Sequence, residues 1–192
     1  MSKLVVSQFV TVDGVMDDPG GSEGSGYGGW AFQFDRGPDG NQFKLDEVME
    51  AGALVLGRVT YEGFAAAWPS RSDEAGFADK FNSMPKYVFS TTLERAEWNN
   101  STLLRGDVVT EVSKLKQQPG GDLLVNGSRT LLRTLMEHDL VDEYRLMVFP
   151  VVIGSGKRLF EDGSTRTALR LTEARPVGPD GVVVLTYEPK RG

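Results

Sequence analysis

The fold of this chain is decided by residues 122–160, which read DLLVNGSRTLLRTLMEHDLVDEYRLMVFPVVIGSGKRLF. An apolar run at 123–125 stops at Asn126-Gly127, and an amphipathic segment with apolar residues at helical spacing opens at Ser128. A second apolar run, 144–153, follows and breaks at glycines. Strand, glycine turn, helix and strand in this order build a parallel sheet. Because the turn leaves free N–H groups at a helix N-terminus, where phosphate binds well, we expect an α/β protein that binds a nucleotide.

Length and composition bound the kind of protein. A chain of 192 residues, 40% hydrophobic and 25% charged, suits one soluble domain, so we expect a single domain over 1–192. The net charge of −6 argues against general nucleic-acid binding, which needs a basic face. With no cysteine and one histidine, we expect no disulfide, no thiolate nucleophile and no metal site. We see no signal peptide and no apolar run near the roughly 18 residues of a membrane helix, so we expect a cytoplasmic protein without membrane contact.

The rest of the chain alternates strand-like and helix-like segments and ends in a hairpin. The turn at 178–181, Gly-Pro-Asp-Gly, predicts that the last two strands are antiparallel. We therefore predict a three-layer α/β/α fold with a mixed, mostly parallel sheet of about eight strands. The predicted strands are 4–12, 53–56, 86–89, 102–104, 123–125, 144–153, 168–175 and 182–188. The predicted helices are 42–51, 60–67 with Thr60 as N-cap, 77–84, one from Asp107 to the Pro119 region, and one from Ser128.

A glycine-rich segment at 17–29 holds six glycines and predicts a flexible loop. It is either a tolerated surface insertion or a mobile lid beside a site. Aromatic residues follow it closely, and Trp30 and Phe43 could form the wall of a pocket for a flat substrate. Core packing explains the same residues about equally well.

Three predicted strands end in polar, turn-forming residues. In a parallel sheet these ends line one crevice, where ligands usually bind. Glycine lets the backbone approach a pyrophosphate, hydroxyls donate hydrogen bonds, and arginines bind phosphate with charge assistance. Each turn alone is weak support, because such residues often serve only the turn, but three in order favour a phosphate site. The candidate residues are Gly57, Arg58 and Thr60, then Ser90, Thr91 and Thr92, then Asn126, Gly127, Ser128 and Arg129.

Asp13 is the carboxylate that most invites a functional interpretation. It follows the first strand and stands beside Gly14 at the mouth of the glycine-rich loop. It is either an ordinary turn aspartate or a polar contact and proton source for a substrate. The sequence does not rank the further acidic candidates Asp35, Asp39, Asp46 and Glu47.

Several motifs together resemble those of a known family. The chain is similar to the dihydrofolate reductase-like superfamily, in the group of the C-terminal reductase domain of the bifunctional riboflavin-biosynthesis deaminase/reductase. The resemblance covers nearly the whole chain, and its specificity lies in the combination. The matching segments are Thr11-Val-Asp-Gly14, Leu56-Gly-Arg-Val-Thr-Tyr61, 86–93, Val125-Asn-Gly-Ser-Arg129, 140–144, Pro150 and 154–160.

The resemblance implies NADPH as hydride donor, a flat heterocyclic or carbonyl/imine substrate, and a homodimer. It implies that the three turns and Val12 contact the cofactor, while Asp13, Gly14, Trp30 and Phe43 face the substrate. Thr91 replaces an arginine common in relatives, which leaves the 2′-phosphate of NADPH to Arg58, with Arg129 or Arg95. Counting back from Gly57 places Asn41 where dihydrofolate reductases carry a carboxylate, so we do not expect a folate substrate. The alternative function is a non-catalytic NADP(H)-binding sensor or scaffold.

Overall fold

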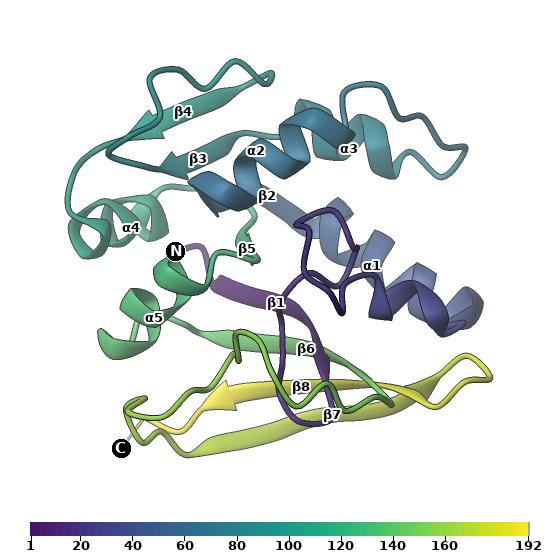
Figure 1. The fold of residues 1–192 in the computed structure, drawn as a ribbon. Coiled ribbons are helices and arrows are strands. Elements are labelled where there is room, and N and C mark those ends of the chain that lie inside the picture. Colours follow the sequence, from purple (N-terminus) through teal and green to yellow (C-terminus); the bar gives the residue numbers. More distant parts are fainter. Residues whose placement is uncertain (192) are drawn as a thin grey trace.

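The computed structural model describes residues 1–191 and shows, within them, one eight-stranded sheet with helices on both faces (Figure 1). The strands are β1 (Leu4–Thr11), β2 (Ala51–Gly57), β3 (Lys86–Phe89), β4 (Ser101–Leu104), β5 (Asp122–Asn126), β6 (Glu143–Phe149), β7 (Leu169–Val177) and β8 (Val182–Pro189). The helices are a short 3-10 helix η1 (Trp30–Gln33), α1 (Gly37–Glu50), α2 (Arg58–Ala67), α3 (Phe77–Ser83), α4 (Val108–Gln117) and α5 (Arg129–Glu137).

The sheet order is β4-β3-β2-β5-β1-β6-β8-β7. The strands from β4 to β6 are parallel, and the hairpin β7–β8 adds antiparallel to β6. This confirms the predicted mixed sheet with a C-terminal hairpin. In the register, Gly57 lies opposite Phe89, Val55 opposite Val125, and Ser7 opposite Asn126. The C-terminal ends of β3, β2, β5 and β1 therefore lie next to one another along a single edge.

Two apolar layers hold the helices against the sheet. Side chains alternate along a strand, so neighbouring residues of β1 enter opposite layers. Leu4 and Val6 pack with α4 and α5, whereas Val5 packs with α1, α2 and α3. In Figure 1 the two groups of helices lie on opposite sides of the sheet. Each fully buried Leu or Val contributes about 1.5–3 kcal/mol, and β1, buried along nearly its whole length, is the centre of the fold.

Element bounds differ from the prediction at two places that proline explains. The first helix begins at Gly37, five residues before the predicted 42, because Pro38 fits the first helical turn, where its missing N–H costs nothing. The strand predicted to reach 153 ends at Phe149. Pro150 cannot donate to a ladder, and Val151 N instead donates to Phe149 O at 2.8 Å.

The glycine-rich segment at 17–29 is a compact loop built around one carboxylate. Asp18 is 1% exposed, and its oxygens accept from Glu23 N at 2.9 Å, Ser25 N at 3.0 Å and Ser25 Oγ at 2.8 Å. Burial alone would raise the pKa of Asp18, but these donors outweigh it and lower the pKa below its ordinary value. The loop thus has a defined closed shape in front of the end of β1 (Figure 1), and its motion as a lid stays a prediction.

Candidate cofactor and substrate site

The turns after β2 and β5 touch each other through Ser128. Its Oγ accepts from Gly57 N at 2.7 Å and donates to Thr60 Oγ1 at 3.0 Å. Thr60 is not the N-cap that the sequence predicted: Gly57 holds that place, and Thr60 lies in the first turn of α2 with its hydroxyl directed at Ser128. Gly127 has a φ of +63°, and a Cβ there would lie 2.5 Å from Thr60 Oγ1. Four of the predicted cofactor residues therefore form one contact unit.

Two helix N-termini open at this unit. Gly57 is the N-cap residue of α2 and Ser128 is the N-cap residue of α5. Neither caps its helix with a side-chain hydrogen bond. Their first-turn N–H groups therefore have no side-chain acceptor from the cap position, and each helix end carries about half a positive charge. One such end would attract an anion only weakly, roughly 0.3–1 kcal/mol. Because two of them meet at the edge of the sheet, the unit suits a diphosphate.

Two hydrogen bonds between β1 and the end of β5 fix the turn after β5 in place. Asn126 Nδ2 donates to Ser7 O at 3.1 Å, and Gln8 Nε2 donates to Gly127 O at 3.4 Å. Ser7 and Gln8 are only 3% and 5% exposed, in the middle of the sheet. A central parallel strand is normally apolar throughout, so two buried polar residues there indicate a site. The sequence interpretation treated this strand as apolar and missed both.

The turn at 90–92 lies farther along the same edge, at the end of β3. Ser90 Oγ accepts from Thr92 N at 3.2 Å and Leu93 N at 2.9 Å, so this hydroxyl is used within the turn. Arg105, which the sequence interpretation did not select, donates to Thr91 O at 3.1 Å and also to Leu93 O at 2.6 Å. The guanidinium of Arg105 thus lies beside Thr91, the residue that stands where the family resemblance implies an arginine.

The two predicted phosphate arginines are both paired with carboxylates in this structure. Arg58 Nη1 contacts Glu62 Oε2 at 2.8 Å, one helical turn along α2, with both side chains close to half exposed. Arg129 pairs with Glu161, and its Nε is buried without a hydrogen-bond partner. Pairs this exposed contribute about 0–1 kcal/mol, so an incoming phosphate can replace the carboxylate.

Asp13 ties the end of β1 to the loop that follows β6. Its carboxylate accepts from Thr11 Oγ1 at 2.6 Å, Gly154 N at 2.8 Å and Ile153 N at 3.2 Å. The Thr11 hydroxyl and then these backbone donors lower the pKa of Asp13 to about 2. A carboxyl that is ionised at neutral pH and already accepts three hydrogen bonds is a poor proton source. The geometry favours the turn role that the sequence left as the alternative.

The predicted substrate residues are placed unequally. Trp30 is 1% exposed, its ring packs edge-on to Phe149 at 5.5 Å, and its Nε1 donates to Asp17 O. Its role as an aromatic wall is therefore corrected: Trp30 belongs to the core and offers no surface to a ligand here. Phe43 is partly buried against the same cluster. Gly14, with a φ of +80°, forms the turn beside Asp13.

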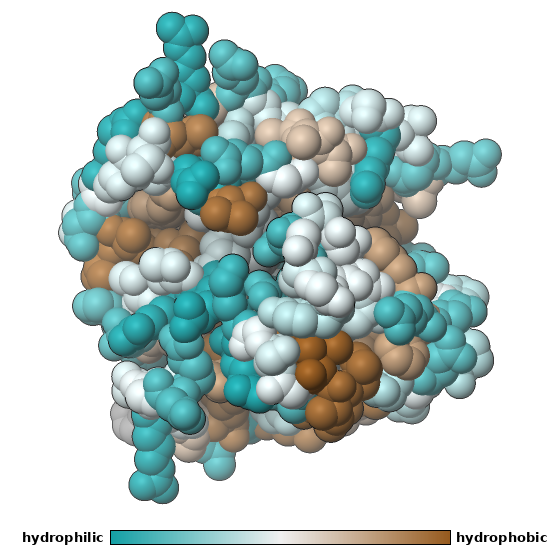
Figure 2. All heavy atoms as spheres, in the orientation of Figure 1, coloured by the Kyte–Doolittle hydropathy of each residue, from teal (hydrophilic) through white to brown (hydrophobic). Residues whose placement is uncertain are grey.

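Val12 is a predicted cofactor residue whose side chain is open to a ligand. It is 63% exposed, and its N–H donates to Val151 O at 3.0 Å. Val152, on the facing loop, is 68% exposed. Figure 2 shows an apolar patch where, in Figure 1, the end of β1 meets the loop after β6. This patch lies at the same edge of the sheet as the contact unit of Gly57, Thr60, Gly127 and Ser128. An apolar surface of this kind suits the face of an aromatic ring.

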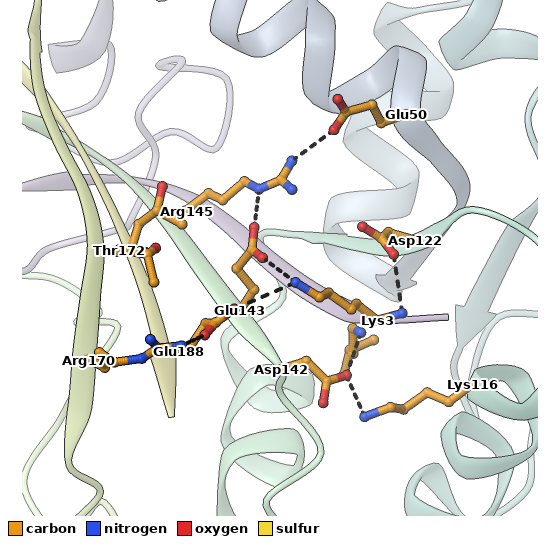
Figure 3. Close-up of polar contacts among 12 residues, drawn as sticks. Lys3, Glu50, Lys116, Asp122, Asp142, Glu143, Arg145, Arg170, Thr172 and Glu188 are labelled. Atoms are coloured by element: carbon orange, nitrogen blue, oxygen red, sulfur yellow. Dashed lines mark hydrogen bonds and ion pairs between the residues drawn. The ribbon is translucent and has the colours of Figure 1, made fainter. Parts of the chain in front are cut away.

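Two hollows differ in what they can bind. A cavity of about 380 Å³ lies near the C-terminal end of β5. Its lining residues include Asp17, Arg129, Lys157, Arg158, Phe160 and Glu161. A larger, open hollow of about 620 Å³ lies at the opposite ends of the strands and is lined by Lys3, Asp142, Arg170, Glu188 and their neighbours. Two of its lining residues are ion-paired with neighbours, Lys3 with Glu143 at 3.0 Å and Asp142 with Lys116 at 2.6 Å (Figure 3). The smaller cavity and the adjoining turns are therefore the candidate ligand site.

Residues 1–191 hold no group of three or more His, Asp or Glu side chains that could bind a metal ion. Within the same residues, none of the helices combines the length and apolarity needed to cross a bilayer.

The chain belongs to the RibD C-terminal domain family, whose model matches residues 2–183. It is 29% identical over 188 residues to the uncharacterized protein YyaP of Bacillus subtilis (strain 168), covering 96% of this chain and 94% of that protein. A solved structure from Shewanella sp. PV-4, named as a riboflavin biosynthesis protein, matches over the whole of both chains with a TM-score of 0.73 at 21% identity. Dihydrofolate reductase from Enterococcus faecalis, complexed with NADP(H), matches 98% of this chain and 97% of its own with a TM-score of 0.61 at 15% identity.

These comparisons confirm the family and the dihydrofolate reductase-like fold that the motifs predicted. Membership in a family of RibD-type reductase domains supports an oxidoreductase. The residues present also fit a dinucleotide. Gly57 and Gly127 let the two turns pack so closely that a Cβ on either would meet Ser128 or Thr60, and Arg129 Nε is a buried donor without a partner.

Proposed function

We propose that this protein is an NADPH-dependent reductase that transfers a hydride to a small heterocyclic or carbonyl/imine substrate. The observation that carries the proposal is the Gly57–Ser128–Thr60 contact, which joins two helix N-termini without side-chain caps at one sheet edge. NADPH, when bound, supplies the hydride, and the protein orients it and excludes water. Gly57, Thr60, Gly127 and Ser128 would hold the diphosphate, and Val12 would face the nicotinamide end.

Cofactor binding is the first test. A ligand that binds only the folded protein stabilises it by about 2.7 kcal/mol at one hundred times its Kd. For a chain of this size that corresponds to a rise in melting temperature of roughly 5–10 °C. We expect NADPH to produce this rise in a differential scanning experiment at millimolar concentration. No shift with either NADPH or NADH would remove the basis of the proposal.

A non-catalytic NADP(H) sensor is the second candidate. The observation that favours it is the engagement of Asp13, the one carboxylate beside the cofactor turns that the sequence selected as a proton source. NADPH consumption with a panel of pterins, pyrimidines and quinones separates the two candidates. Binding without turnover of any of these compounds would favour the sensor.

Arg58 is our proposed reader of the 2′-phosphate. Replacing Arg58 with alanine removes a charge-assisted contact of about 1.5–3 kcal/mol, so the Kd for NADPH should rise roughly tenfold to a hundredfold, and the Kd for NADH much less. The control is Glu62→Gln, which removes the competing carboxylate 2.8 Å away and should not weaken NADPH. Equal weakening of both cofactors by Arg58→Ala would show that Arg58 does not read the extra phosphate.

We also propose that the protein is a homodimer. The outer edge strand β7 is exposed along most of its nine residues, and Leu171 on it is 50% exposed. An edge of this length presents unpaired backbone groups to which a second chain can pair. Light scattering coupled to size-exclusion chromatography should give twice the mass of the chain, and a monomer at micromolar concentration would refute this.

A further inference from the structure

The face of α1 that packs on β1 carries an ion pair in an apolar layer. Lys44 Nζ lies 2.5 Å from Glu47 Oε2, and the two side chains are only 13% and 1% exposed. This contact between Nζ and Oε2 does not have the geometry of a hydrogen bond. Both oxygens of the buried Glu47 carboxylate are therefore without a hydrogen-bond donor. Burying a charge in this way costs several kcal/mol before its partner compensates. A pair that is satisfied so incompletely needs a reason beyond the stability of the fold.

Lys44 reaches the strand that anchors the cofactor turns. Its Nζ donates to Ser7 Oγ at 2.7 Å and lies 5.3 Å from the centre of the Phe9 ring. The backbone oxygen of the same Ser7 accepts from Asn126, in the turn after β5. Ser7 alone therefore links the Lys44 ammonium to Asn126 in the predicted dinucleotide site. The ammonium lies on the face of the sheet that α1 covers.

The other cations near Glu47 are held differently. Arg145 of β6 donates to Glu143 at 2.6 Å and faces Glu50 at 3.9 Å, so its guanidinium lies between two carboxylates (Figure 3). Arg36 donates to Asn41 Oδ1 at 2.7 Å and lies 5.4 Å from the Phe9 ring. An ammonium has three donors, and Lys44 uses only one of them in a hydrogen bond with good geometry. Lys44 is thus a largely buried cation with donors to spare, and its hydrogen bond to Ser7 places it against β1.

We propose that Lys44 is a catalytic residue that binds an acceptor oxygen or nitrogen of the substrate, with Glu47 as its counter-ion. This inference rests on the proposed reductase function. When the substrate carbon accepts the hydride and its two electrons, the π pair of the C=O or C=N bond moves to the heteroatom. Lys44 gives that heteroatom a proton and regains one from water. Glu47, almost fully buried behind the ammonium, is its counter-ion and does not touch the substrate.

The side of the substrate ring that faces α1 should carry an oxo group. An ammonium donates hydrogen bonds and accepts none, so it favours rings that turn an oxo group toward it. A ring amino group at the same place would set donor against donor and leave a buried polar group unpaired, which costs about 1–3 kcal/mol. The site should therefore prefer oxo-heterocycles to their amino analogues.

Two pteridines test this preference directly. Lumazine and pterin differ at ring position 2, where lumazine has an oxo group and pterin an amino group. Isothermal titration of the NADP⁺-saturated protein should show lumazine binding at least about tenfold tighter than pterin. Lys44→Met should abolish the difference, and Lys44→Arg should keep most of it. Lys114→Met, at a lysine that is 62% exposed on α4, is the matched control and should behave as wild type.

The outcomes separate this inference from the proposed function. NADPH affinity, measured by fluorescence, should change less than twofold in Lys44→Met, which also shows that this variant is folded. If NADPH binds to wild type but lumazine and pterin bind equally or not at all, the role of Lys44 is refuted and the reductase proposal stands. A lumazine preference that survives in Lys44→Met also refutes it. Absence of NADPH binding to wild type would instead refute the proposed function itself.

Discussion

Replacing Gly127 with alanine should weaken NADPH binding about a hundredfold, the loss of roughly 2.7 kcal/mol. The backbone at Gly127 has a φ of +63°, and a Cβ would lie 2.5 Å from Thr60 Oγ1 and 3.0 Å from Thr60 Cγ2. Both atoms belong to a side chain that the Ser128 hydroxyl holds in place. The methyl group must therefore push apart the two helix N-termini that we assign to the diphosphate. Fluorescence titration of NADPH measures the loss.

Two further variants separate crowding from backbone strain. Gly181→Ala has a similar φ of +79° in the β7–β8 hairpin, with no neighbour nearer than 3.9 Å, so it carries the strain without the crowding. It should lower the melting temperature slightly and leave NADPH affinity unchanged. Adding Thr60→Ala to Gly127→Ala removes the obstructing atoms and should recover part of the affinity. Full affinity in Gly127→Ala alone would show that this turn does not hold the cofactor.

The part of the site that follows from local turn chemistry could be predicted from the sequence. Gly57, Gly127 and Ser128 stand where apolar runs stop and helices start, and a parallel sheet brings such places to one edge. The strand order that puts β3, β2, β5 and β1 side by side is not encoded in any one segment. No strand order was predicted: the resemblance to a known family implied the fold as a whole, and the comparisons confirmed that family.

What the sequence could not supply were the partners of each side chain. The sequence left two roles open for Asp13, and besides the nearby Thr11 it is Ile153 and Gly154, far along the sequence, that donate to its carboxylate and favour the turn role. Trp30 looked like a pocket wall because it follows a loop, but the face it covers belongs to β6 and β8. Both assignments depend on contacts more than 100 residues apart, which periodicity and turn signals do not report.

One sequence signal was present and was overlooked. The first strand reads LVVSQFVT, and the polar pair at its centre, Ser7 and Gln8, conflicts with a strand buried on both faces. In the structure Gln8 donates to Gly127 O in the turn after β5, and Ser7 accepts from Lys44. Lys44 itself could not be selected, because a lysine on a predicted amphipathic helix is expected on the solvent side. Its burial emerges only once α1 is seen against β1.

Lys86 should be the lysine whose loss destabilises the fold most. It is 0% exposed, and its Nζ donates to Asn82 O and Met84 O, both at 2.8 Å, and to Asn99 O at 3.0 Å. The Trp98 ring lies 4.2 Å from the same nitrogen. Burial lowers the pKa of Lys86 to about 8, so at pH 7 the group is still mainly an ammonium with all three donors in use. This ammonium joins α3 to the loop before β4 at the start of β3, the strand whose other end carries the turn at 90–92.

Lys86→Met keeps the length and most of the volume of the side chain and removes all three donors. Each buried carbonyl left without a donor costs about 1–3 kcal/mol, and relaxation of the loop recovers part of the sum, so we expect a loss of roughly 3 kcal/mol and a fall in melting temperature of about 6–12 °C. The exposed Lys114→Met should cost less than about 1 kcal/mol, because its partner is a surface carboxylate. Urea denaturation of both variants gives the comparison. Equal midpoints for the two variants would mean that water hydrogen-bonds the three carbonyls when the ammonium is gone. Lys86 would then not be what joins α3 to the loop before β4.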